Sequence, residues 1–92
     1  MDELPRRYRD LLTPDEQRFF LAWLRICREM GGMADLKTIE KRLGLTSEQV
    51  RNYFGELSRK LNKTSGVEIM TEGLKEMGWW PLPKPPWYRP RK

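Results

Sequence analysis

The chain has 92 residues, 38% of them hydrophobic, and a formal charge of +5 from 18 basic and 13 acidic side chains. It contains no histidine and one cysteine, which excludes histidine-based catalysis, histidine metal ligation, an intrachain disulfide and a cysteine zinc cluster. No apolar run reaches the ~18 residues of a membrane span, and the N-terminus is too charged for a signal peptide. These features predict one small domain, cytoplasmic or nucleoid-associated, with no membrane contact, enzymatic activity, cofactor, metal or small-molecule substrate.

The first predicted helix follows a charged N-terminal arm, residues 1–12. Thr13, Pro14 and Glu16 form a strong helix start, because they supply an N-cap, a proline at the first helical position and the partner of a capping box. Apolar residues then recur every three or four positions, and Gly31 marks the end of the helix. These apolar residues are Phe19, Phe20, Trp23, Leu24, Cys27 and Met30. The same spacing places the thiol of Cys27 in the core rather than in a reactive site.

Two further helices are predicted with a tight turn between them. Asp35 can cap the first of these, which ends at Gly44. Thr46, with Gln49 three residues later, can cap the next, which is predicted to run to about Lys63. One face of this last helix is continuously apolar. That face consists of Val50, Tyr53, Phe54, Leu57 and Leu61.

The pattern changes after this helix. Residues 67–71 alternate apolar and polar side chains, which predicts a short strand, and residues 79–80 could begin a return strand that Pro81 limits. Residues 81–92 hold five of the seven prolines and a charge of +4, which favours an extended tail. The expected fold is therefore mainly α: three helices with a helix-turn-helix and a short β-hairpin wing over residues 13–80, followed by the Pro/Trp-rich tail.

This order of elements resembles a winged helix-turn-helix, and above all the DNA-binding domain of OmpR/PhoB-type response regulators. The similar segments are LTPDE at residues 12–16, Val50 with LSRKL at residues 57–61, and IMT at residues 69–71 followed by Gly-Trp at 78–79. LuxR-type helix-turn-helix domains, which lack a wing, resemble residues 12–62 almost as well. The resemblance implies a transcriptional regulator that binds duplex DNA with the helix over about 46–63. The wing departs from the family, because residues 67–80 carry a charge of −2 where a wing that touches phosphates is normally basic.

On this reading, the N-terminal part of the last helix contacts base edges, and cations nearby contact the phosphate backbone. The predicted base-reading residues are Ser47, Gln49, Arg51 and Asn52. The predicted phosphate contacts are Lys37, Thr46, Arg59, Lys60 and Lys63. Gly55, in the middle of the same helix, is either a tolerated surface glycine or a point where a partner closely approaches the backbone.

The tail adds a second set of candidate contacts, for a protein partner or for nucleic acid. They are Trp87, Tyr88, Arg89 and Arg91. Aromatic rings between cations can stack on bases, but they can equally fold back on the domain. The rival hypothesis is therefore a protein-interaction module that docks on transcription or replication machinery through the acidic wing and this tail. Homodimer formation is open under both hypotheses.

Overall fold

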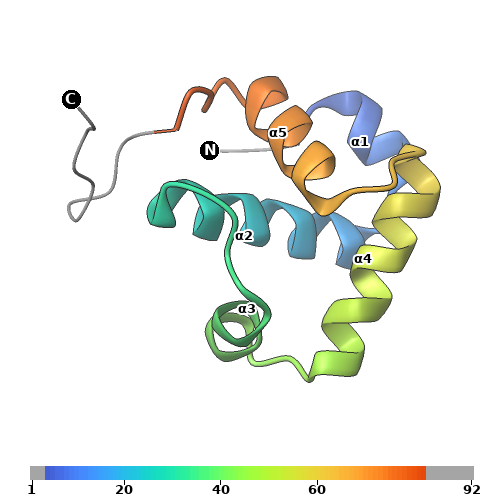
Figure 1. Ribbon diagram of the computed structural model, residues 1–92. Helices are drawn as coiled ribbons and strands as arrows, with labels where there is room; N and C mark the ends of the chain where they lie inside the picture. The colour runs from blue at the N-terminus through green and yellow to red at the C-terminus, as the bar shows by residue number, and fades with distance from the viewer. Residues whose placement is uncertain (1–3, 83–92) are drawn as a thin grey trace, which may run out of the picture.

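A computed structural model describes residues 4–82, and every regular element in that range is an α-helix. The helices are α1 (Arg6–Leu11), α2 (Pro14–Met30), α3 (Leu36–Leu43), α4 (Ser47–Leu61) and α5 (Gly66–Glu76). The long α2 lies at the centre, where α1, α3, α4 and α5 all contact it (Figure 1). The mainly helical class predicted from the sequence is thus confirmed for the described residues.

The predicted caps of α2 and α4 are present as complete capping boxes. The Thr13 hydroxyl accepts a hydrogen bond from the Glu16 amide at 3.2 Å, and the Glu16 carboxylate accepts one from the Thr13 amide at 2.9 Å. Thr46 and Gln49 repeat this exchange at the start of α4. Each exchange satisfies amides that a helix start would otherwise leave without partners, and so fixes where the helix begins.

The predicted β-hairpin wing is wrong. The described part of the chain contains no strand, and residues 67–71 lie inside α5. The Ser65 hydroxyl caps this helix by accepting a hydrogen bond from the Val67 amide at 3.2 Å. Ile69, Met70 and Leu74 are buried, which is helical spacing. A segment of only five residues could satisfy both periodicities, and the buried positions beyond it decide for the helix.

Gly73 allows α5 to pack closely on α2. A Cβ atom added to Gly73 would lie 2.9 Å from Cζ of Phe20 and 3.0 Å from both Cδ atoms of Leu24. Both of these α2 side chains are fully buried. Gly73 is therefore a helix-packing residue, at which the absence of a side chain sets the distance between two helices.

Residues 4–12 of the N-terminal arm, for which no regular structure was predicted, fold onto the same core. Pro5 precedes α1 at its N-cap, where a proline does not break a helix. Leu4, Tyr8 and Leu12 are all buried, and the Tyr8 ring meets the Phe20 ring edge-on with centroids 5.1 Å apart. Residues 4–12 thus form part of the helical domain.

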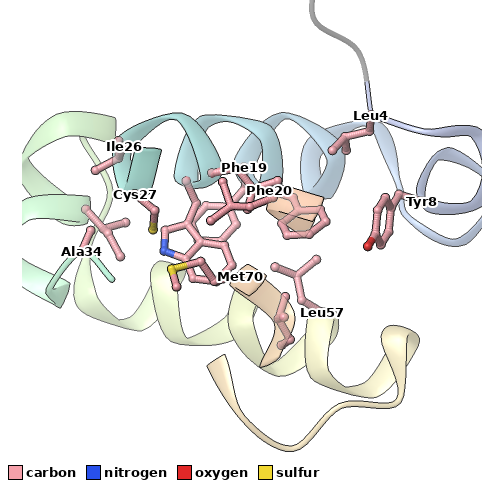
Figure 2. Close-up of a cluster of buried hydrophobic side chains, with 14 of the residues drawn as sticks. Leu4, Tyr8, Phe19, Phe20, Ile26, Cys27, Ala34, Leu57 and Met70 are labelled. Atoms are coloured by element: carbon pink, nitrogen blue, oxygen red, sulfur yellow. The ribbon is translucent and has the colours of Figure 1, made fainter. Parts of the chain in front are cut away.

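The core between these helices is rich in aromatic rings from α2 and α4. Phe19 stacks on Tyr53 at 4.6 Å, and Phe54 meets both Phe19 and Trp23 edge-on. Figure 2 shows Leu4 and Tyr8 at one end of the buried cluster and Ile26, Cys27 and Ala34 at the other. The prediction that Cys27 is a core thiol is confirmed: it is fully buried, and this burial raises the pKa of the thiol.

Candidate nucleic-acid interface

The α3–turn–α4 unit comprises α3, the connecting residues 44–46 and α4, which pack against each other (Figure 1). Gly44 ends α3 with φ 66°, a left-handed conformation that glycine adopts without the strain of a side chain. Leu45 packs partly buried against the core, and Thr46 then caps α4. The chain therefore changes direction between the two helices within these few residues, and the first turn of α4 is left at the surface.

The outward face of α4 is polar and exposed. Exposed side chains on it belong to Glu48, Arg51, Asn52 and Arg59, with the exposed Gly55 among them. The structure therefore places two predicted base-reading residues, Arg51 and Asn52, in the open. Ser47 is half-buried, and the Gln49 side chain is already committed to the capping box. The available readers are accordingly fewer than the sequence suggested.

Some cations on this unit form no ion pair within the described part of the fold. Among the described residues, Lys37, Lys41 and Arg51 form no ion pair and contact no aromatic ring, and all three are exposed. Lys37 and Lys41 lie one turn apart on α3, and Arg51 lies on α4. Lys41 was missing from the predicted contacts, although its spacing of four residues from Lys37 places both on one face of a helix.

The other predicted phosphate contacts are engaged within the fold. Lys60 is half-buried and pairs with the buried carboxylate of Glu16 at 2.5 Å. Lys63 pairs with Glu72 of α5 at 2.9 Å, and Arg59 pairs with Glu56 one turn away on α4. The sequence could not reveal the first two pairs, because each acid lies far from its lysine in the chain and only the tertiary fold brings them together.

The pKa of Glu16 shows how strongly this lysine is tied to the fold. Burial alone would raise the pKa of the carboxyl group, but hydrogen bonds from Lys60 and from the Thr13 amide lower it overall. Glu16 therefore serves both the α2 cap and the contact with α4. Lys60 is better described as a structural cation than as a free phosphate ligand.

Surface hollows adjoin α4, and two of them differ in character. An open cleft of about 320 Å³ between the start of α2 and α4 is lined by Thr13, Asp15, Glu16, Gln49, Asn52, Tyr53 and Glu56. An apolar groove of about 340 Å³ is lined by Met33, Ala34, Leu36, Ile39, Phe54, Ser58, Gly66 and Ile69. Across the described residues, no cluster of three or more acidic or cysteine side chains is suited to hold a metal ion.

The predicted tail contacts Trp87, Tyr88, Arg89 and Arg91 lie outside the described residues. Just before the tail, the ring of Trp79 lies 4.7 Å from the Arg28 guanidinium, and Trp80 is exposed. Of the helices in the described range, none is both long and apolar enough to cross a membrane.

Comparison with known proteins found no match: no family model, no curated protein and no solved structure corresponds to this chain. The wing that the resemblance to OmpR/PhoB-type domains implied is not present, because α5 occupies residues 67–71, where its first strand was predicted. The LuxR-type resemblance needs no wing and remains a prediction. Any assignment of function therefore depends on the residues themselves.

Proposed function

We propose that this chain binds duplex DNA through its α3–turn–α4 unit, with the outward face of α4 in the major groove. The observation that supports this most directly is the position of the unpaired cations. Lys37, Lys41 and Arg51 all lie on this unit and form no ion pair among the described residues. Cations without an internal partner are available to neutralise phosphates, which supply most of the affinity for DNA.

The residues on α4 suit base recognition in the major groove. A guanidinium such as that of Arg51 can donate two hydrogen bonds to guanine, and an amide such as that of Asn52 can bond adenine in the same way. Glu48, on the same exposed face, can accept a hydrogen bond from cytosine. The exposed first turn of α4 presents backbone amides that can meet a phosphate.

The acidic character of residues 67–80 no longer opposes this proposal. Glu72 pairs with Arg7 and Lys63, and Glu76 pairs with Arg7, so both acids are used between helices of the fold. Two of the three acids of this segment are thus paired within the fold, and the third, Glu68, lies on α5 and not on the α3–turn–α4 unit. By analogy with other helix-turn-helix proteins, we propose that the biological role is transcriptional regulation.

One of the two features behind the rival hypothesis, a protein-interaction module, is absent from the described residues. That hypothesis relied on docking through the wing and the aromatic tail, and the wing is absent from the described residues. Its remaining support, the Trp87–Tyr88 segment, lies outside them. The apolar groove beside Met33 is compatible with a protein ligand, but its composition favours no particular one.

A gel-shift titration tests the proposal. The chain should retard random-sequence duplex at low salt, and the double variant Arg51→Ala plus Asn52→Ala should bind at least about tenfold more weakly, the equivalent of one lost bidentate contact. The double variant Arg6→Ala plus Lys75→Ala, which changes side chains on α1 and α5, serves as the control. Absence of retardation at tens of micromolar protein, or equal binding by both variants, would refute the proposal.

A further inference from the structure

Gly55 is a glycine that the fold does not require. It lies in the interior of α4 and is exposed, and a Cβ atom added to it would meet nothing within 4 Å. Its φ is not in the positive range that favours glycine. A glycine in a helix interior destabilises the helix relative to alanine, because it loses more backbone entropy on folding. Glycine therefore makes the helix less stable here than alanine would, and no contact or backbone conformation of the fold explains it.

At other positions of the chain, the structure explains why glycine is required. Gly31 and Gly44 end helices at φ 74° and 66°, where a side chain would be strained. Gly73 faces Phe20 at a distance that excludes a side chain. Gly55 has neither justification; Gly32 also has open space and no positive φ, but it lies just after a helix, whereas Gly55 lies in a helix interior, where glycine is destabilising.

The surroundings of Gly55 indicate the chemistry of what approaches it. Arg51 and Asn52 lie one turn before it on α4, and Arg59 lies one turn after it. All three side chains are exposed and polar. A glycine at a contact between two protein helices is normally flanked by apolar side chains, as Gly73 is by Ile69, Met70 and Leu74. The face around Gly55 is hydrophilic, and because Arg59 pairs with Glu56, the cation on it that forms no ion pair among the described residues is Arg51, which can meet a polyanion.

We propose that Gly55 marks the point of closest approach between α4 and duplex DNA. In this arrangement the missing side chain lets the α4 backbone lie against the wall of the major groove, so that Arg51 and Asn52 reach the base edges from the turn before it. Gly55 is then a positioning residue for recognition rather than a reader of sequence. This inference rests on the proposed function and adds to it the depth and orientation at which the helix binds.

The test uses the fact that stability and binding should change in opposite directions. Gly55→Ala should raise Tm by about 4–8 °C, because alanine favours the helix. It should nevertheless weaken binding to random-sequence duplex about tenfold, a loss of about 1.4 kcal/mol. Gly55→Gln, with a longer side chain, should weaken binding further. Thr71→Ala is the control, since it raises helix propensity in α5, away from the outward face of α4.

The outcomes separate the two proposals. If the natural chain and Thr71→Ala bind equally while both Gly55 variants bind weakly, the inference is supported. If all four proteins bind equally, Gly55 is a tolerated surface glycine and the inference is wrong, although DNA binding stands. If the natural chain does not bind duplex at all, the proposed function fails, and the inference fails with it. Monitoring Tm for each variant shows that weakened binding does not arise from unfolding.

Discussion

Tyr8 shows how strongly the core is dominated by ring packing. Its side chain is buried, and its hydroxyl oxygen has no hydrogen-bond partner among the described residues. Burial raises the pKa of this hydroxyl to about 12. A buried polar group without a partner costs free energy, because it loses its hydrogen bonds to water and gains none. The ring must compensate for this loss through its contact with Phe20.

The residue-scale prediction follows from this imbalance. Tyr8→Phe removes the unpaired hydroxyl and keeps the ring, so the free energy of unfolding should stay unchanged or rise by up to about 1 kcal/mol. Tyr8→Ala removes the ring as well and should cost about 3–5 kcal/mol. Urea denaturation measures both. A loss of more than about 1 kcal/mol in Tyr8→Phe would show that the hydroxyl has a partner in solution.

At the scale of elements, ion pairs connect helices that are distant in sequence. Arg7 of α1 pairs with Glu72 and Glu76 of α5, and Lys63, just after α4, also pairs with Glu72. Hydrogen bonds from Lys63 and then from Arg7 lower the pKa of the Glu72 carboxyl group, against the opposing effect of burial. These contacts hold the short α1, which is only six residues long, beside α5.

This arrangement predicts a specific acid sensitivity. Because the pKa of Glu72 is lower in the folded state than in the unfolded state, the pairs stabilise the fold fully above the ordinary glutamate pKa of about 4.3. That contribution is lost as the pH falls through the lowered folded-state value. Glu72→Gln should therefore reduce stability near neutral pH and should lose less stability than the natural chain on acidification to about pH 3.

Thermal unfolding at several pH values measures this difference. The pairs are partly exposed, so we expect an effect of no more than about 1 kcal/mol at neutral pH. Glu68→Gln is the matched control, because Glu68 is exposed on the same helix and forms no ion pair among the described residues. Parallel stability curves for the natural chain and Glu72→Gln between neutral and acidic pH would contradict the assigned role.

The elements also differ in how far the sequence could predict them. The starts of α2, α3 and α4 were predictable because Thr13, Asp35 and Thr46 make local capping contacts with residues three positions later. The predicted end of α4, at about Lys63, lies close to the observed end at Leu61, after which Asn62 adopts a left-handed conformation. α5 also has a local cap at Ser65, but residues 67–71 fit the period of a strand as well as that of a helix, so the cap alone did not reveal it.

At the scale of the whole molecule, the charge of +5 becomes informative only when the pairs are removed from it. Lys60 and Lys63 looked equivalent to Lys37 as phosphate contacts, yet both pair with acids from distant segments. The candidate interface could therefore be located from the sequence, as the turn and the polar face of α4. The residues that contribute to it could not be predicted. Tertiary ion pairs decide which cations stay available, and no local sequence pattern encodes them.

The central claim is that the available cations of the α3–turn–α4 unit bind the phosphates of duplex DNA. The salt dependence of binding, measured by fluorescence anisotropy with labelled duplex, tests it most directly. The slope of log K against log salt should be negative, and Lys37→Gln plus Lys41→Gln should reduce its magnitude by about 2, at about 0.9 per phosphate contact. Arg6→Gln plus Lys75→Gln removes the same charge elsewhere and should leave the slope nearly unchanged. A slope near zero for the natural chain, or equal reductions in the two variants, would contradict the claim.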